Sequence, residues 1–227
     1  MRTLAVGDIH GFCGALTALL GQLKPHEDRL VFLGDYVDRG PSSKEVLETL
    51  SALCTNTNHV FLRGNHDDWM LRARAEKSWF KSWIGEGVGG KATLRSYGAA
   101  GTGWQMLEMV PAAHWRFLEE THFCFESESH IFAHAAVTAS PLEYNDPHWL
   151  MWGELDAIMA HPSGKRIIVG HTSQASGVPL DLGYVVAIDT FCSGTNWLSA
   201  FDVDANVVYQ ANEAGQTRRF ELGEMAG

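Results

Sequence analysis

The sequence predicts an α/β fold, the class in which strands and helices alternate along the chain. Three apolar runs, at 3–6, 30–33 and 60–62, each indicate a short buried strand. A polar, glycine-containing loop follows each run, and a segment with helical spacing of apolar residues follows each loop. Three such units in succession predict a parallel sheet with right-handed crossovers. Their exit loops should converge at one edge of the sheet, where α/β proteins bind ligands.

The first of these loops, 7–11, has the sequence GDIHG. In extended backbone Asp8 and His10 point to the same side, because they are two residues apart. A carboxylate beside an imidazole is half of a site for a transition metal. Taken alone, the pair is also explained by a turn aspartate and a surface histidine.

The second and third loops add complementary chemistry. Loop 34–40 (GDYVDRG) carries two carboxylates and a guanidinium, and loop 63–67 (RGNHD) carries a second guanidinium, an amide and an imidazole. If the loops share one edge, potential metal ligands and phosphate-binding arginines lie together there. The residues so predicted to converge are Asp8, His10, Asp35, Asp38, Arg39, Arg63, Asn65 and His66.

Residues 76–110 interrupt this rhythm with tryptophans and glycines, and we expect a lid inserted into a single domain that spans 1–227. Within it, 85–92 (GEGVGGKA) nearly matches a phosphate-binding P-loop. Ala92 stands where that motif needs a Mg²⁺-binding hydroxyl, and no strand precedes it, so the P-loop interpretation is rejected. We expect the lid tryptophans to pack rather than to stack on a base.

Two later strands, at 130–133 and 165–169, each end at a histidine, His134 and His171. A histidine directly after a buried strand is costly without a partner, so two in equivalent places suggest metal ligation. Further strands are expected at 121–126, 184–189, 197–203 and 207–211, and a helix at 111–120. The last three strands predict a second, more antiparallel sheet.

Composition limits the partners. The formal net charge of −10 over 227 residues argues against nucleic-acid binding, and means that local cations must attract any phosphate substrate. No apolar run approaches the ~20 residues of a membrane helix, and the first motif begins too early for a signal peptide. Four well-separated cysteines predict free, buried thiols. We therefore expect a cytoplasmic protein without a membrane partner.

The three loop motifs, followed in order by His134 and Gly170-His171, resemble the phosphoprotein phosphatase family of metallophosphoesterases. The similarity runs from residue 3 to about Asp189 and is strongest to short bacterial and phage serine/threonine phosphatases. It implies a four-layer α/β/β/α sandwich that holds two divalent metal ions. Oxygen and imidazole ligands suit Mn²⁺, Fe or Zn²⁺, and we expect Mn²⁺.

The resemblance also implies a role for each residue. Asp8, His10 and Asp35 would hold one metal, with Asp35 bridging to a second held by Asn65, His134 and His171. A metal-bridging hydroxide would attack the phosphorus of a phosphomonoester. His66 would protonate the leaving group with Asp38 as its partner, and Arg39 and Arg63 would clamp the phosphate.

The motifs are compatible with more than one activity. Symmetrical dinucleoside tetraphosphate hydrolases share the first three motifs but tend to lack the Asp38-Arg39 pair, which favours the phosphatase. A phosphodiesterase, or a binding scaffold that kept the fold without catalysis, would also carry these loops. The expected substrate is a phosphorylated protein or a small phosphoester.

One departure from the family concerns Glu154, which stands where members commonly carry a phosphate-binding arginine. Another cation could replace it, with Arg95, Lys165 or Arg166 as candidates. The substrate could carry less charge at this point, as a diester does. Alternatively, Glu154 is a surface residue.

Overall fold

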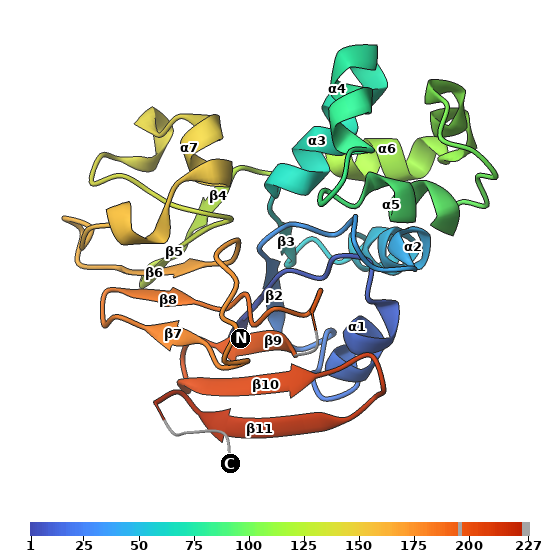
Figure 1. Ribbon diagram of the computed structural model, residues 1–227. Coiled ribbons are helices and arrows are strands. Elements are labelled where there is room, and N and C mark those ends of the chain that lie inside the picture. Colours follow the sequence, from blue (N-terminus) through green and yellow to red (C-terminus); the bar gives the residue numbers. More distant parts are fainter. Residues whose placement is uncertain (195–196, 224–227) are drawn as a thin grey trace.

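Two β-sheets pack face to face, with helices on their outer faces (Figure 1). The computed structural model describes residues 1–194 and 197–223. Among these residues, one sheet has six strands in the order β11-β10-β9-β1-β2-β3, and the other has five in the order β4-β5-β6-β8-β7. This arrangement confirms the predicted α/β/β/α fold.

The first sheet contains the parallel unit predicted from the sequence. β1 (Thr3–Val6) pairs in parallel with β2 (Arg29–Phe32), and β2 pairs in parallel with β3 (Val60–Phe61). The loops that leave these three strands therefore emerge at the same edge. β9 (Leu198–Asp202) pairs with β1 in antiparallel fashion, and β10 (Val207–Ala211) and β11 (Thr217–Glu221) extend the sheet outward.

The second sheet brings two further loops to that edge. β5 (His130–Ala133), β6 (Arg166–Val169) and β8 (Val185–Ala187) are parallel neighbours. The short strands β4 (Cys124–Glu126) and β7 (Leu180–Asp181) are antiparallel additions at its two margins.

The prediction for the C-terminal strands was wrong in one respect. Only the segment at 184–189 joins the second sheet, as β8, whereas the other two segments join the first sheet as β9 and β10. All five residues of β9 are buried, because it lies between β1 and β10. An alternating or apolar pattern specifies a strand but not the sheet that receives it.

The two helical layers are unequal. The helices beside the first sheet are α1 (Cys13–Leu20), α2 (Ser43–Leu53), α3 (Asn65–Ala75), α4 (Lys77–Trp83), α5 (Gly90–Ser96) and α6 (Ala112–Glu119), with the 3₁₀ turn η1 (Trp104–Met109). Within the described part of the chain, the second sheet is covered by one short helix, α7 (Pro147–Trp152), and by the turns η2 (Leu142–Tyr144) and η3 (Leu155–Ala157). None of the described helices is long and apolar enough to cross a membrane.

The segment predicted to be a lid is firmly packed. Phe80, Trp83, Leu94 and Leu107 are buried in the same apolar cluster as the helices α1 and α2. The P-loop-like stretch forms the turn into α5 and the first residues of that helix. The four cysteines are free as predicted, although Cys192 is the one that is buried.

The core between the two sheets should be the most sensitive to truncation. Phe132 is completely buried there and its ring stacks on that of Phe125, with centroids 5.8 Å apart. We expect Phe132→Ala to lower the free energy of unfolding by ~3–5 kcal/mol in urea titrations. Met159→Ala is the control, because this side chain is 69% exposed and should cost less than ~0.5 kcal/mol. Equal losses in the two variants would contradict this view of the core.

Candidate active site

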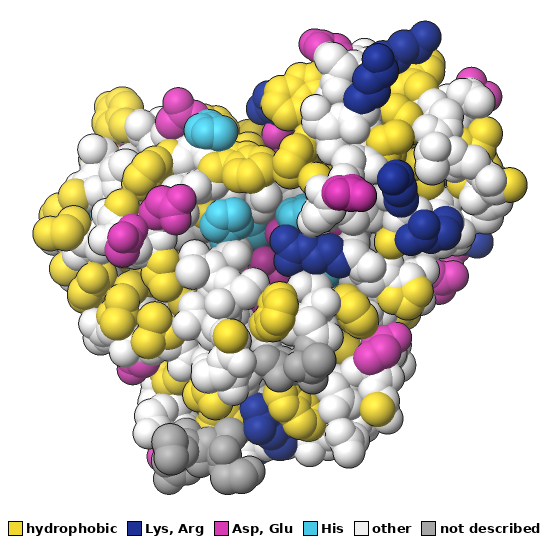
Figure 2. Space-filling view, viewed as in Figure 1, with side chains coloured by type: hydrophobic (Ala, Val, Ile, Leu, Met, Phe, Trp, Pro, Cys, Tyr) yellow, Lys and Arg dark blue, Asp and Glu magenta, His cyan; other side chains and the backbone are white. Residues whose placement is uncertain are grey.

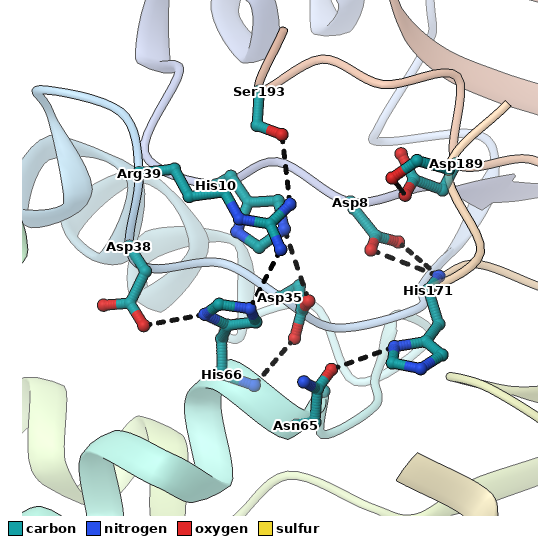
Figure 3. Close-up of polar contacts among 12 residues, drawn as sticks. Asp8, His10, Asp35, Asp38, Arg39, Asn65, His66, His171, Asp189 and Ser193 are labelled. Atoms are coloured by element: carbon teal, nitrogen blue, oxygen red, sulfur yellow. Dashed lines mark hydrogen bonds and ion pairs between the residues drawn. The ribbon is translucent and has the colours of Figure 1, made fainter. Parts of the chain in front are cut away.

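The polar loops that leave β1, β2, β3, β5 and β6 meet between the two halves of the molecule. Figure 2 shows histidine and acidic side chains together in a hollow near the middle of one face, beside a basic side chain. Figure 3 shows the residues of this site and their contacts. Asp8, His10, Asp35, Asn65 and His134, all predicted as metal ligands, are buried here, and His171 is partly buried beside them.

Asp35 lies at the centre of the site. Its Oδ2 is 3.3 Å from Nε2 of His10, which comes from the first loop, and its Oδ1 is 3.5 Å from Nε2 of His134, which comes from the second sheet. Oδ1 also accepts a hydrogen bond of 3.0 Å from the backbone N–H of His66. Because one carboxylate oxygen faces each histidine, Asp35 is positioned to bind two cations at once.

The donor set around Asp35 fits metal ions. Nδ1 of His10 donates to the carbonyl oxygen of Val37 and Nδ1 of His134 to that of Leu33, both at 2.9 Å, so each Nε2 presents a lone pair. Nε2 of His134 faces the Asn65 Oδ1 at 2.8 Å, and that oxygen is 3.1 Å from Nδ1 of His171. Acceptors that face one another without a hydrogen between them favour a cation at their centre.

Two groups of side chains among the described residues have the spacing of metal ligands. One joins His10, Asp35 and His66, and the other joins Asp35, His134 and His171, with ligand atoms within 4.8 Å of one another in each group. The second group, together with Asn65, corresponds to the predicted second metal. The first group contains His66 and not Asp8, whose carboxylate lies outside both groups.

Asp8 is buried on the other side of the site, next to Asp189 (Figure 3). Its two carboxylate oxygens each accept from the backbone N–H of His171 at 3.2 Å. Burial, with the nearby charges of Asp189 and Asp35, raises the pKa of Asp8 well above its ordinary value. A cation would relieve this repulsion. Asp189, which no sequence motif pointed to, is therefore part of the same charged cluster.

The histidines fall into two electrostatic classes. Burial lowers the pKa of His10 to about 3 and that of His171 to about 4, and it also lowers the pKa of His134. These three imidazoles are neutral near pH 7, the form that binds metals. Burial acts on His66 as well, but the charges of Asp35 and Asp38 outweigh it and raise its pKa. His66 thus differs from the ligands as a group suited to carry a proton.

His66 is held by a closely packed network. Its Nδ1 lies 2.8 Å from Oδ2 of Asp38, and its Nε2 is 3.2 Å from Nη2 of Arg39. The fully buried Asp38 carboxylate accepts further hydrogen bonds from Trp83 Nε1 at 3.0 Å and from Thr93 Oγ1 at 2.7 Å. Helices α4 and α5 therefore hold the partner of His66 in place. No local pattern in the sequence indicates that Trp83 and Thr93 contact Asp38.

The backbone of the site is in unusual conformations. Left-handed φ angles occur at His10 (48°), Asp35 (53°), Asp38 (74°), Arg39 (65°) and His171 (62°), none of which is glycine. Non-glycine residues in this region are strained, and such strain is concentrated at functional sites.

Gly64 is required by the close approach of two loops. A Cβ atom at this position would lie 2.1 Å from Oδ1 of Asp35. The buried carboxylate of Asp67 fastens the same loops together, because it accepts from the backbone N–H groups of Asp35, Tyr36 and Gly64 at 2.8–3.0 Å.

The predicted phosphate-binding role of Arg63 is not supported by its position. Its Nε donates to Thr121 Oγ1 at 3.0 Å, and its Nη2 donates to the carbonyl oxygens of Leu118 and Glu119 at 3.0 and 2.9 Å. The guanidinium also lies over the ring of Phe123. Arg63 thus satisfies the C-terminal carbonyls of α6, a favourable place for a cation. A sequence motif could not show this rotamer.

Arg39 remains as the predicted arginine at the site. It is exposed, and its Nη1 donates to Ser193 Oγ at 3.1 Å. Ser193 lies in a loop that no motif pointed to.

The structure also bears on the explanations for Glu154. This residue is exposed after α7, as the surface explanation requires. Lys165 pairs with Glu126, and Arg166 pairs with Asp181. Both cations lie at the start of β6, whereas His171 follows its other end, so neither can replace the missing arginine. Arg95 is exposed on α5.

A two-sheet fold with a buried cluster of carboxylate, amide and imidazole ligands defines the class of dinuclear metallohydrolases. The family model described as calcineurin-like phosphoesterase matches residues 1–207 of this chain. The chain belongs to that family, whose members use dinuclear metal centres, and is a hydrolase of the metallophosphoesterase superfamily.

Curated relatives match over a short segment. A symmetrical bis(5'-nucleosyl)-tetraphosphatase of Pectobacterium atrosepticum is 42% identical over 77 residues, which cover 33% of this chain and 27% of the relative. The enzyme of the same name from Klebsiella pneumoniae is 44% identical over 73 residues, covering 31% and 25%. The matched segment thus spans about a quarter of each relative.

Solved structures are similar over nearly the whole chain. A putative diadenosine tetraphosphatase has a TM-score of 0.66 and 19% identity, covering 96% of this chain and 92% of its own. The cold-active protein-tyrosine phosphatase of a psychrophilic Shewanella has a TM-score of 0.62 and 16% identity, covering 97% and 80%. A serine/threonine phosphatase of Saccharomyces cerevisiae has a TM-score of 0.60, 16% identity and the same coverage. At these identities the similarity shows the fold.

The network around Asp38 predicts a specific kinetic defect. Thr93→Val removes one donor from the buried carboxylate with little change in side-chain volume, and should misalign His66. We expect kcat to fall roughly tenfold for an alkyl phosphate, whose leaving group needs a proton, and much less for p-nitrophenyl phosphate. Thr49→Val is the control, because its hydroxyl bonds to the backbone of its own helix. An equal loss on both substrates would show that Thr93 does not act through the proton donor.

Proposed function

We propose that this chain hydrolyses phosphomonoesters, in the manner of serine/threonine phosphatases, with His66 as the general acid. The observation that carries the proposal is the 2.8 Å contact between His66 and the buried Asp38 beside the Asp35-centred ligand groups. The expected substrate is a phosphorylated protein or a small phosphoester, and the expected location is the cytoplasm.

Each protein group has a part in this reaction. Two divalent metal ions, for which Mn²⁺ is proposed, would supply Lewis acidity that neutralises charge on the phosphoryl group. They would be held by Asp8, His10, Asp35, Asn65, His134 and His171. Arg39 is exposed and positioned by Ser193 to bind a non-bridging phosphate oxygen.

Proton delivery is the task of His66. Its Nε2 donates to the oxygen of the departing alcohol, while Asp38 holds the ring through Nδ1. In this structure Nη2 of Arg39 lies 3.2 Å from the same Nε2, and because a guanidinium donates but cannot accept, this contact is a hydrogen bond only when Nε2 carries no proton.

A second candidate is the symmetrical hydrolysis of dinucleoside tetraphosphates. It is supported by the names of the curated relatives and of one structural neighbour. The Asp38-Arg39 pair favours the phosphatase, because enzymes of the second kind tend to lack it. Phosphodiester hydrolysis is a third candidate, consistent with Glu154 at the position of the family arginine.

The choice can be tested by measuring phosphate release with Mn²⁺ from a phosphothreonine peptide and nucleotide products from diadenosine tetraphosphate, side by side. We expect turnover of the peptide. Asp35→Asn serves as the blank for both substrates, because it removes the carboxylate shared by the two ligand groups. Turnover of the dinucleotide alone would replace the leading proposal by the second candidate, and activity that survives in Asp35→Asn would contradict the site itself.

The pH profile tests the role of His66. A general acid works in its protonated form, so kcat should fall as the pH rises through the pKa of His66. The charge of Asp38 raises that pKa. Asp38→Asn should therefore move the alkaline limb to lower pH, besides lowering kcat. Glu119→Gln, which removes an exposed carboxylate paired with Arg74, should leave the limb unchanged. If the alkaline limb does not move in Asp38→Asn, the limb reports the titration of a group other than His66.

A further inference from the structure

An aromatic pocket opens beside the candidate active site. It has a volume of about 240 Å³ and is lined from two sides of the cleft, by α3 and α4 on one side and by α7 on the other (Figure 1). The lining residues are Asp68, Trp69, Arg72, Trp79, His148 and Trp152. In Figure 2, hydrophobic side chains lie immediately above the hollow that contains the histidines.

The tryptophans of this pocket are less buried than Trp83 and Trp115 of the core, although Trp69 also packs against the core cluster. Trp83 is fully buried and Trp115 is 5% exposed, whereas Trp69, Trp79 and Trp152 are each partly exposed. We predicted that the lid tryptophans pack rather than stack on a base; Trp83 packs in the core, and Trp79 packs against Arg72 at the margin of this pocket. Contiguous exposed apolar surface is a feature of ligand-binding grooves.

The rings are arranged as walls. Trp69 and Trp152 meet edge to face, with centroids 5.5 Å apart and an interplanar angle of 69°. His148 stacks on Trp152, and the Arg72 guanidinium lies over Trp79 at 4.9 Å.

Two of these walls also contact the site. The ring of Trp69 is 6.1 Å from that of His66, and the ring of Trp152 is 6.2 Å from that of His171. The pocket therefore lies one aromatic ring away from the proton donor and from a metal ligand. A substrate that extends from the site toward Trp69 and Trp152 would reach this pocket.

The charges of the pocket are already neutralised. Nε of Arg72 donates to Oδ2 of Asp68 at 2.6 Å, so the cation is paired within the protein. A phosphate would gain little there, whereas an uncharged flat ring could stack on the indole faces that Arg72 and His148 leave uncovered.

We infer that this pocket binds the nucleobase of a nucleotide substrate. The inference rests on the proposed phosphoester hydrolysis, and it specifies the chemical class of the alcohol that is esterified to the phosphate. Trp69 and Trp152 separate the pocket from His66 and His171, so a ring bound in it needs a spacer of about the size of a sugar before the reacting phosphate. A phenol bonded directly to the phosphoryl oxygen, as in phosphotyrosine, would lie short of the pocket.

Binding can be measured without turnover, by calorimetry with the metal-loaded His66→Asn protein, which lacks the proposed proton donor. The probes are AMP and ribose 5-phosphate, which differ only in the base. We expect AMP to bind roughly tenfold more tightly, because one stacked base contributes about that factor. Equal affinities would overturn the inference. Since no hydrolysis is required, a failure here is distinct from a failure of the proposed function, which the activity assays decide.

Substitutions of the pocket tryptophans test whether the preference for AMP arises in this pocket. Trp79→Leu, on the wall that contacts no metal ligand, should abolish the preference for AMP, and Trp152→Leu should do the same. Trp104→Leu is the matched control, because Trp104 is a 36% exposed tryptophan that lines a different pocket of the lid. A preference that survives in both pocket variants would overturn the inference. A second contrary result would be that O-phosphotyrosine binds more tightly than O-phosphothreonine and that this difference is lost in the same variants, while AMP binding is unaffected. The pocket would then bind a phenol ring and not a nucleobase.

Discussion

The position of the Asp35 carboxylate is the constraint on which the rest of the site depends. Its two oxygens face histidines from different sheets, and its own backbone N–H is held by Asp67. Asp67 is fully buried, and burial with the charge of Asp35 raises its pKa to about 8. Burial of this acid is unfavourable, but its carboxylate binds backbone N–H groups of the second loop and of Gly64, just before α3. Without these hydrogen bonds, neither Asp35 nor His66 would have a fixed position.

The sequence was sufficient for the part of the site that follows from parallel strands. Loops that leave parallel neighbours must meet at one edge, which is why Asp8, His10, Asp35 and Asn65 could be placed together. His134 and His171 follow strands of the other sheet, and only the family resemblance implied that they share the site. The sheet that receives each C-terminal strand could not be predicted, because pairing there depends on contacts between distant segments. The same reason explains why the contacts of Trp83 and Thr93 with Asp38 were not foreseen. Arg63 was misplaced because a long, flexible side chain takes its direction from neighbours far along the chain.

The inserted segment 76–110 packs into the candidate site and does not merely cover it. Trp83 and Thr93 donate to Asp38, and a Cβ atom on Gly89 would lie 2.3 Å from the backbone nitrogen of Arg39. Two of the three functional residues of the second loop, Asp38 and Arg39, are thus in contact with the insertion. A change of sequence in this segment would therefore alter the surroundings of these two side chains.

The ligands of the second predicted metal have a consequence for stability. Asp35 and Asn65 follow strands of one sheet, and His134 and His171 follow strands of the other. A cation held by all four would cross-link the two sheets at their shared edge. Binding of that ion and packing of the sheets are then linked equilibria, so each strengthens the other by mass action. For this fold the metal would be a structural component as much as a reagent, and the cell's supply of it would help to decide how much of the chain is folded.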